Sequence, residues 1–245
     1  MELAHSPETP KLLRPTFYLC AGVAGAGCTT AVENLVKSGI ARAGPGQIVS
    51  RPARAEEIHA GRKDNRNAYK QYYFVKADKM EKTKPILRTY QEKYGNTYGF
   101  TSTAVEKIKI MLTTSNVILD ALGSKDDWQI LLGNKPLVML YFAPENLALT
   151  GDRLRLRMQA QNGKINETEF ILRLKANARN IGDEIGKYDY WIDTTDLNEV
   201  VPAVTSVIAL TSYGETSLLH PRVVSISENA ARIDQLIGDY QTDSM

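Results

Sequence analysis

The segment that most constrains the fold is a glycine-rich turn, Gly22 to Thr29, with the sequence Gly-Val-Ala-Gly-Ala-Gly-Cys-Thr. A short apolar run, 16–21, precedes it, and the apolar residues of 29–38 recur at helical spacing. An apolar run without polar alternation predicts a strand buried on both faces of a parallel sheet. A glycine turn between such a strand and a helix places backbone N–H groups at the helix N-terminus, where phosphate groups bind. The turn therefore predicts an α/β fold with a phosphate-binding loop.

The turn matches the pattern G-x-x-x-x-G-K-[ST], except that Cys28 stands at the lysine position. Its glycines let backbone N–H groups approach phosphate oxygens, because a Cβ atom would obstruct that approach. Thr29 matches the hydroxyl that holds Mg²⁺. A thiolate would be repelled by phosphate, so we interpret Cys28 as a neutral substitute for the lysine. The alternative is a glycine turn that binds nothing. The residues predicted to bind the nucleotide phosphates are Gly22, Gly25, Ala26, Gly27, Cys28, Thr29 and Thr30.

Further strands and helices alternate along the chain. The apolar-run pattern returns at 116–119, 136–142 and 188–192. Helical stretches separate or follow these runs, roughly at 103–113, 126–132, 145–160, 167–187 and 196–210. Strands that alternate with helices predict βαβ units and a parallel sheet covered on both faces. We therefore expect a three-layer α/β fold.

Two polar segments interrupt this alternation. Residues 50–101 are rich in Arg, Lys, Tyr and Asn, and their only clear strand is 72–75, so they predict an inserted subdomain. Residues 150–168 are polar and arginine-rich, and we interpret them as a mobile flap within a lid at 150–175. The chain as a whole is predicted to consist of a flexible leader at 1–14, a core domain at 15–211 that includes the insert and the lid, and a C-terminal extension at 212–245. The extension contains an amphipathic helix at 226–237.

Composition excludes several classes of function. Lys and Arg number 30 against 28 Asp and Glu, so the net charge of +2 argues against a protein of nucleic-acid or membrane surfaces. No apolar stretch is long enough for a transmembrane helix, and no signal-peptide pattern opens the chain. Cys20, Cys28 and the three histidines lack the spacing of a zinc site. These features predict a cytoplasmic protein.

Several patterns, in order from about residue 16 to 208, resemble the guanylate kinase family of nucleoside monophosphate kinases. The glycine turn is similar to that family's phosphate loop. Ser50-Arg51-Pro52-Ala53-Arg54 resembles its T-R-x-P-R motif, with the proline shifted by one position. The resemblance implies that Arg51 and Arg54 hold the phosphate of the acceptor monophosphate, which suits guanidinium forks. The alternative is two solvated surface arginines.

Two tyrosines extend the implied acceptor site. Tyr72-Tyr73-Phe74-Val75 resembles the family's Y-x-F-V strand, and 95–99 (Gly-Asn-Thr-Tyr-Gly) resembles its G-N-x-Y-G turn. The resemblance implies that Tyr72 and Tyr98 contact the acceptor. The spacing from the arginines implies an insertion within 59–71. Packing of these rings in the subdomain is the alternative.

The catalytic residues implied by the resemblance are a carboxylate and three arginines. Val117-Ile118-Leu119-Asp120 resembles the I-L-D-[IV]-D strand, which places Asp120 near Mg²⁺ and the phosphates, at the strand end where α/β sheets bind ligands. A helix-capping Asp is the alternative. The pattern at 153–157 resembles the lid motif R-L-x-x-R, and 188–190 resembles the Y-D-[YH] strand. The arginines implied to close over the transferring phosphoryl group are Arg153, Arg157 and Arg173; a solvated helix face is their alternative.

The sequence also departs from the family pattern at the base-recognition positions. The acceptor-site Glu aligns near Thr89, with Glu92 close by, and the second Asp of I-L-D-x-D aligns with Leu122. We therefore expect an ATP- and Mg²⁺-dependent phosphotransferase acting on a nucleoside monophosphate or related phosphorylated acceptor, not strictly guanine. A weak or inactive kinase-like module that binds a phosphorylated ligand or phosphopeptide is the alternative. A kinase that modifies nucleic acid is disfavoured, and dimerisation through the C-terminal stretch stays open.

Overall fold

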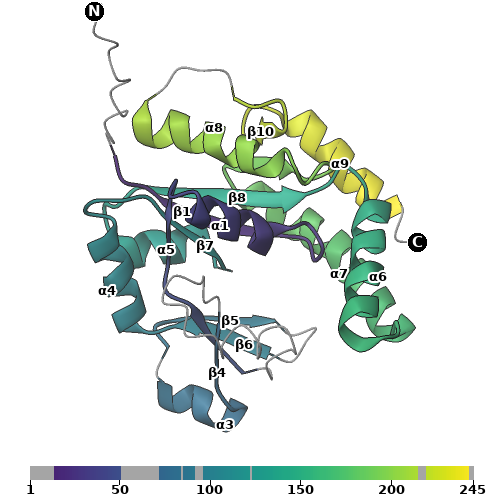
Figure 1. Ribbon diagram of the computed structural model, residues 1–245, viewed down its shortest axis with the longest axis horizontal. Helices are drawn as coiled ribbons and strands as arrows, with labels where there is room; N and C mark the ends of the chain where they lie inside the picture. The colour runs from purple at the N-terminus through teal and green to yellow at the C-terminus, as the bar shows by residue number, and fades with distance from the viewer. Residues whose placement is uncertain are drawn as a thin grey trace, which may run out of the picture.

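The computed structural model describes residues 14–50, 72–83, 85–91, 96–121, 123–214 and 219–242. Its main sheet has six strands in the order β10-β9-β8-β1-β7-β2 (Figure 1). All are parallel to their neighbours except β10, which runs antiparallel to β9. The strands are β1 (Phe17–Gly22), β2 (Arg42–Ala43), β7 (Val117–Asp120), β8 (Leu137–Ala143), β9 (Tyr190–Asp193) and β10 (Val223–Ser225). The predicted α/β fold with a parallel sheet is confirmed.

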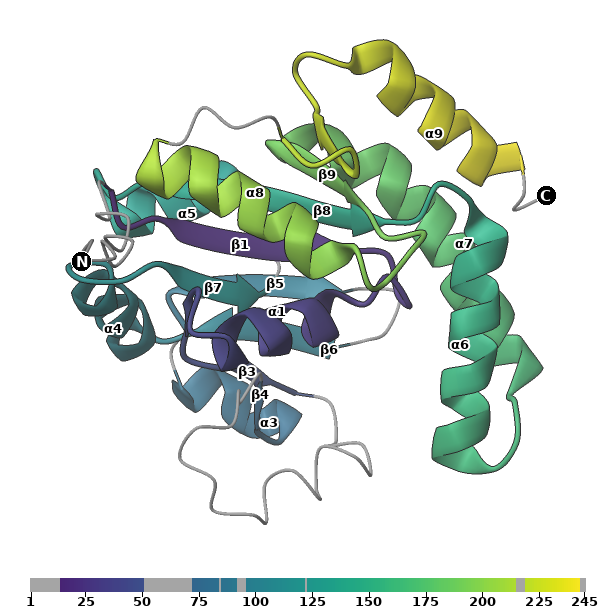
Figure 2. The same cartoon turned by 45° about the horizontal axis from the view of Figure 1, so that its top comes forward.

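Helices cover both faces of this sheet, which gives three layers. Helices α1 (Cys28–Lys37) and α8 (Val200–Tyr213) lie on one face, and α5 (Lys125–Leu132) and α7 (Glu167–Glu184) lie on the other, with α4 (Ser102–Met111) beside α5 (Figure 2). The side chains of β1 from Phe17 to Cys20 are fully buried between these layers. The apolar run without alternation thus occupies the centre of the sheet, where both faces exclude water.

Side-chain caps fix where several helices begin. The side chains of Thr101, Ser124, Asn146 and Asn166 each accept a hydrogen bond from the backbone N–H three residues later. Such caps satisfy N–H groups that have no partner within the helix. The short remaining elements are α3 (Ala77–Met80) and the 3₁₀ turns η1 (Glu81–Thr83) and η3 (Ile185–Lys187).

The polar segment predicted as an insert contributes to a second sheet, with the order β4-β3-β6-β5. Its strands are β3 (Gln47–Val49), β4 (Tyr72–Phe74), β5 (Leu87–Gln91) and β6 (Asn96–Phe100). The expectation of one clear strand in 50–101 was wrong, since β4, β5 and β6 all lie in this range. Strands β5 and β6 were not recognised because their residues are polar and lack an alternating pattern. Gly99 lets this hairpin close, since a Cβ there would lie 2.9 Å from the Leu87 carbonyl oxygen and 2.8 Å from Pro85 Cβ.

The arginine-rich flap predicted at 150–168 is a helical hairpin. Helix α6 (Leu147–Asn162) ends at Gly163, whose left-handed backbone (φ 68°) turns the chain towards α7. Leu154, Met158 and Phe170 form a small apolar core between the two helices. The hairpin projects from the edge of the main sheet at which β1 and β8 end (Figure 2). The two helices correspond to the helical stretches predicted at 145–160 and 167–187, and this small core packs them together.

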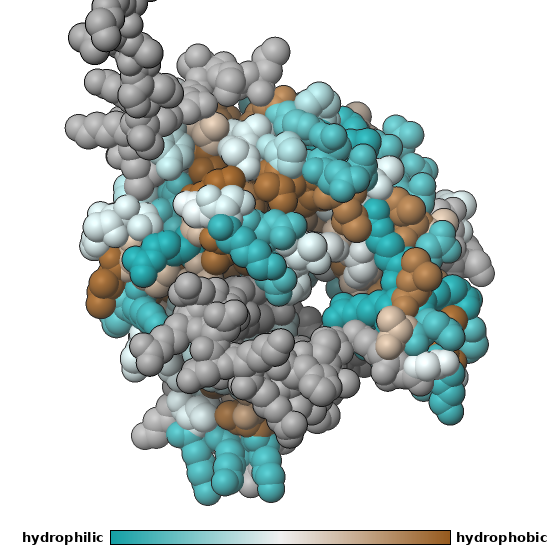
Figure 3. All heavy atoms as spheres, viewed as in Figure 1, coloured by the Kyte–Doolittle hydropathy of each residue, from teal (hydrophilic) through white to brown (hydrophobic). Residues whose placement is uncertain are grey.

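The C-terminal residues form one strand and one helix. The predicted helix is present as α9 (Ala230–Thr242), whereas β10 was not predicted because it has only three residues. On the face shown in Figure 3 the surface over α9 is largely hydrophilic, whereas hydrophobic and hydrophilic residues are mixed over the α6–α7 hairpin. No helix in the described part of the chain is long and apolar enough to cross a membrane. The boundaries of the predicted domains stay predictions.

Candidate phosphate-binding site

The glycine loop lies between the end of β1 and the start of α1, and two of its glycines are sterically required. A Cβ on Gly22 would lie 2.2 Å from the Phe142 carbonyl oxygen of the adjacent strand. Gly27 has φ 85°, and a Cβ there would lie 2.8 Å from Leu197 Cδ2. The loop therefore passes close to β8 on one side and to the segment after β9 on the other. The first N–H groups of α1 have no partner within the helix, and they carry its positive dipole end.

Asn177 of α7 braces the loop from the other face of the sheet. Its Oδ1 accepts a hydrogen bond from the Ala24 N–H (2.8 Å), and its Nδ2 donates one to the Ala24 carbonyl oxygen (2.9 Å). The Asn177 side chain is only 1% exposed. A buried amide that satisfies both backbone groups of one residue fixes the position of that residue. The loop is consequently held in shape before any ligand arrives.

Cys28, at the lysine position, brings no charge to this loop. Burial, and after it the negative charge of Asp120, raises the pKa of the Cys28 thiol well above its ordinary range. The thiol is therefore protonated at neutral pH, even though it begins a helix. The loop residue at the lysine position therefore supplies no positive charge.

Thr29 and Asp120 meet at the base of the loop. The Thr29 hydroxyl donates a hydrogen bond of 2.6 Å to Asp120 Oδ2. Asp120 ends β7, in register with Cys20 of β1, and its carbonyl oxygen accepts a hydrogen bond from Gln47 Nε2 (2.9 Å). No group of three or more ligating side chains occurs among the described residues. A hydroxyl and one carboxylate nevertheless fit Mg²⁺, which takes one or two protein oxygens and completes its shell with phosphate and water.

Arg153 is the predicted lid arginine that the structure places against the glycine loop. A Cβ on Gly25 would lie 3.7 Å from Arg153 Cβ and 3.2 Å from the Thr150 carbonyl oxygen. The Arg153 guanidinium donates from Nη2 to the Thr195 carbonyl oxygen (3.0 Å). Its Nη1 is buried and has no hydrogen-bond partner within the described ranges. Burial lowers the pKa of Arg153, but a guanidinium stays charged at neutral pH.

The two other predicted lid arginines lie elsewhere on the hairpin. Arg157 is exposed on α6, one turn beyond Arg153. Arg173 forms an ion pair with Glu169 of its own helix, with a hydrogen bond of 3.0 Å from Nε. Arg155, which was not predicted to take part, pairs with Glu167 (2.9 Å) and stacks over Phe170. Arg153 is thus the arginine with the strongest geometric case for contact with a phosphate at the loop.

The structure brings together the two tyrosines predicted for the acceptor site. Tyr72 of β4 and Tyr98 of β6 lie on strands that flank β3, and their ring centroids are 6.0 Å apart in an edge-to-face arrangement. Thr89 pairs with Tyr98 across the β5–β6 ladder. The predicted acceptor arginines, Arg51 and Arg54, lie outside the described residues. So do Glu92 and Leu122, which stand at or near the two base-recognition positions where the sequence departs from the family pattern.

Residues 16–211 match the guanylate kinase family model. The chain belongs to the guanylate kinase family. A guanylate kinase of Nitrosospira multiformis is 28% identical over 195 residues, which cover 79% of this chain and 84% of that protein. The crystal structure of a guanylate kinase from Anaplasma phagocytophilum has the same fold, with a TM-score of 0.55 and 18% identity over 89% of this chain and 94% of that one. The chain is therefore a nucleoside monophosphate kinase-like enzyme of the guanylate kinase family.

Two residues of this guanylate kinase family site were missed by sequence reasoning. Asn177 carried a signal, because it lies on the buried side of α7 together with Ala178 and Ile181. A polar side chain at a core position of an amphipathic helix needs a buried partner. Asp193 carried a similar signal, since it ends the buried strand β9 and is itself only 1% exposed.

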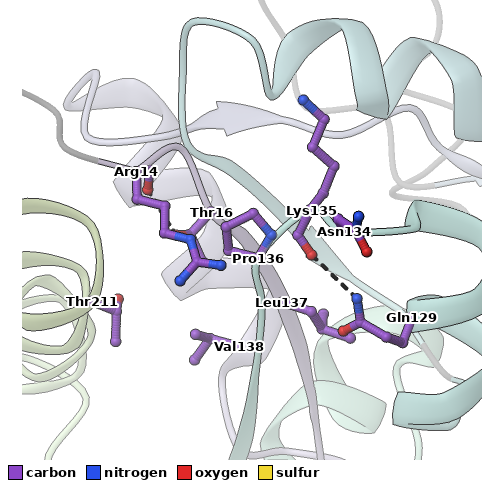
Figure 4. Close-up of a pocket in the computed structure, with 9 residues that line it drawn as sticks. All are labelled: Arg14, Thr16, Gln129, Asn134, Lys135, Pro136, Leu137, Val138 and Thr211. Carbon is purple, nitrogen blue, oxygen red and sulfur yellow. Dashed lines mark hydrogen bonds between the residues drawn. The ribbon is translucent and has the colours of Figure 1, made fainter.

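A cavity of about 410 Å³ lies away from this site (Figure 4). It is lined in part by Thr16, Pro136 and Leu137, which precede or begin β1 and β8, and by Thr211 of α8. The glycine loop follows the opposite, carboxyl end of β1. In open α/β sheets ligands bind at the carboxyl ends of the strands, so the cavity is not part of the nucleotide site.

Proposed function

We propose that this guanylate kinase family enzyme transfers the γ-phosphoryl group of ATP to a nucleoside monophosphate or a related phosphorylated acceptor, without strict selection of guanine. The observation that carries the proposal is the position of Arg153, a partly buried arginine whose Cβ lies beside the lysine-free glycine loop. One nitrogen of its guanidinium, Nη1, is buried and unpaired among the described residues. A cation held at that point offsets the missing lysine charge.

The donor half of the proposed site consists of backbone, hydroxyl and carboxylate groups. The N–H groups at the start of α1 would bind the phosphates of ATP, and Thr29 with Asp120 would hold Mg²⁺. The metal supplies positive charge that neutralises the phosphate oxygens when it is bound. Arg153 would stabilise charge on the group in transit, because phosphoryl transfer depends mainly on positioning and charge stabilisation. Loss of one such charge contact costs on the order of 3 kcal/mol, so we propose slow turnover.

The acceptor half of the proposed site lies on the second sheet. Arg51 and Arg54, which lie outside the described residues, are the proposed phosphate ligands. Tyr72 and Tyr98, whose rings meet edge to face, are proposed to contact the acceptor as well. Guanine offers N1–H and N2–H donors, which require carboxylate or carbonyl acceptors. Thr89 stands at the position of one such acceptor. This replacement supports an acceptor whose base is not restricted to guanine.

A second candidate is a module that binds a phosphorylated ligand or phosphopeptide without transferring phosphate. The protonated Cys28 thiol favours it, because the loop then lacks the cation that usually contacts the donor phosphates. Arg153 favours the enzyme, since a binder that uses only the acceptor site has little need of a cation at the donor loop.

A coupled ADP-release assay with ATP-Mg²⁺ and a panel of ribo- and deoxynucleoside monophosphates separates the two candidates. We expect slow turnover with at least one acceptor, lost in Arg54→Ala and Arg153→Ala and retained in Lys109→Ala, which removes an exposed lysine paired with Glu106. The panel then identifies the acceptor. Binding of a monophosphate or phosphopeptide without turnover for any acceptor would favour the binding module instead.

A further inference from the structure

The C-terminal extension, here residues 219–242, follows the region that matches the family model and packs beside the site. Strand β10 pairs with β9, and Val223 lies in register with Ile192. Helix α9 packs on α7, where a Cβ on Gly182 would lie 3.3 Å from Gln241 Nε2 and 3.7 Å from Ile237 Cγ2. In Figures 1 and 2 the extension runs along the edge of the sheet towards the base of the α6–α7 hairpin. It therefore contacts α7, the helix that carries Asn177, and lies near the base of the hairpin that carries Arg153.

Arg222 of the extension is bonded to the buried carboxylate that ends β9. Its Nη1 forms an ion pair with Asp193 Oδ2, and its carbonyl oxygen accepts a hydrogen bond of 2.8 Å from the Asp193 N–H. This contact with Asp193 raises the pKa of Arg222. A carboxylate that is 1% exposed requires such a charged partner, so Arg222 fixes the position of Asp193.

Asp193 in turn fixes Thr195. Its Oδ1 accepts hydrogen bonds from the Thr195 N–H (2.8 Å) and from the Thr195 hydroxyl (2.6 Å). The same hydroxyl accepts a hydrogen bond of 3.1 Å from the Glu145 N–H, in the segment after β8. The Thr195 peptide is thus held on two sides, and its carbonyl oxygen is the acceptor for Arg153 Nη2 (3.0 Å). Ion pair and hydrogen bonds run without a break from Arg222 through Asp193 and Thr195 to Arg153.

Helix α9 supports the same region from a second direction. The Tyr240 hydroxyl is buried and donates a hydrogen bond of 2.8 Å to the Pro144 carbonyl oxygen. Tyr240 lies close enough to Arg153 to influence its pKa. Arg232 pairs with Glu145 (3.1 Å) and stacks over Trp191 of β9. The segments that follow β8 and β9 are consequently both tied to the extension.

We propose that the C-terminal extension is a positioning element, in which Arg222, acting through Asp193 and Thr195, orients the Arg153 guanidinium towards the donor phosphates. The inference rests on the proposed function, in which Arg153 supplies the charge that Cys28 lacks. An arginine on a long side chain gives its full effect only when its orientation is fixed in advance. In this proposal Arg222 and Asp193 make no contact with the nucleotide and act on it through Arg153.

A double-mutant cycle between Arg222 and Arg153 tests this dependence. We would measure the Kd of ATP-Mg²⁺ by titration calorimetry, together with kcat and the acceptor KM, for Arg222→Ala, Arg153→Ala and the double variant. We expect Arg222→Ala to weaken ATP binding or lower kcat on the order of 10- to 100-fold, with little change in acceptor KM. In the Arg153→Ala background the same change should have no further effect. Lys109→Ala is the control for loss of an exposed ion pair.

A structural role alone gives a different result. Equal losses from Arg222→Ala with and without Arg153, or no loss at all, would overturn the inference. If Arg222→Ala does not fold, Arg222→Lys takes its place in the cycle, since it keeps the charge beside Asp193 but not the planar fork. If the unmutated protein binds ATP but shows no turnover, the proposed function is wrong. The coupling between the Arg222 and Arg153 substitutions, measured in the Kd of ATP-Mg²⁺, still tests the inference. A natural protein that does not bind ATP overturns both.

Discussion

The Thr29 hydroxyl lies 2.6 Å from Asp120 Oδ2 and donates a hydrogen bond to it, although the two residues are 91 positions apart in the chain. The contact joins the first turn of α1 to the end of β7, and it orients the two oxygens that are proposed to bind Mg²⁺ at the base of the glycine loop. It also gives the carboxylate a partner next to the buried thiol of Cys20 and the partly buried thiol of Cys28, whose pKa values its charge helps to raise.

Thr29→Val removes this hydroxyl and keeps the shape of the side chain. We expect the Mg²⁺ concentration for half-maximal activity to rise and kcat to fall about tenfold or more, because one metal ligand is lost. Stability should fall by only about 1 kcal/mol. Activity at varied Mg²⁺ and urea unfolding measure the two effects. Thr205→Val is the control, since among the described residues the Thr205 hydroxyl bonds to a carbonyl of its own helix. An equal rise in the Mg²⁺ requirement of that variant would contradict the prediction.

Cys28→Lys restores a cation to the loop. We expect kcat to rise on the order of 10- to 100-fold, because a second positive charge then stabilises the transferring group. Cys28→Met has a similar side-chain length without the charge, and it should give no rise. Steady-state kinetics with the acceptor found in the panel measure both variants. A kcat that is unchanged in Cys28→Lys would mean that Arg153 already satisfies the site.

Arg153→Lys keeps the charge but loses the forked guanidinium. In that fork Nη2 bonds to Thr195, and Nη1 stays available for a ligand. We expect kcat to fall on the order of 100-fold in Arg153→Ala and less in Arg153→Lys. Arg155→Ala is the matched change on the same helix, where the guanidinium pairs with Glu167 instead. A loss in Arg155→Ala as large as in Arg153→Ala would show that both variants act by destabilising the hairpin.

The Cys28 thiol should react slowly with iodoacetamide in the folded protein. An ordinary cysteine has a pKa of about 8.5 and is half ionised at that pH. The pKa of Cys28 is raised, so the thiolate, which is the nucleophile, forms only at higher pH. Mass spectrometry of the alkylated protein at several pH values measures the rate. In urea the rate should rise to that of a free thiol; equally fast alkylation without urea at pH 8.5 would contradict the raised pKa.

Asn177→Ala should destabilise the protein without touching a ligand. It leaves both backbone groups of Ala24 without their buried partner, which costs about 2 to 3 kcal/mol. Asn34→Ala, at an exposed position of α1, should change the free energy of unfolding by less than about 0.5 kcal/mol. Urea denaturation measures both. A loss in Asn177→Ala no larger than that in Asn34→Ala would show that water replaces the amide at little cost.

Much of the main sheet could be predicted because its strands are buried on both faces. The apolar runs at 16–21 and 136–142 appear as β1 and β8 with small shifts of their ends. Five strands were missed, because they are short or polar: β2, β3, β5, β6 and β10. Such strands are stabilised by pairing with a neighbour, and a single sequence does not display the neighbour.

The sequence by itself determined the strand–turn–helix order around Gly22–Thr29 and the absence of lysine at Cys28. These are properties of neighbouring residues, and local steric and hydrogen-bonding rules govern them. Only the tertiary structure decided that Arg153, rather than Arg157 or Arg173, lies against the loop. It also decided that Arg222 reaches Arg153 through Asp193 and Thr195. Those contacts join residues far apart in the chain, and packing of the sheet, the hairpin and the extension brings them together.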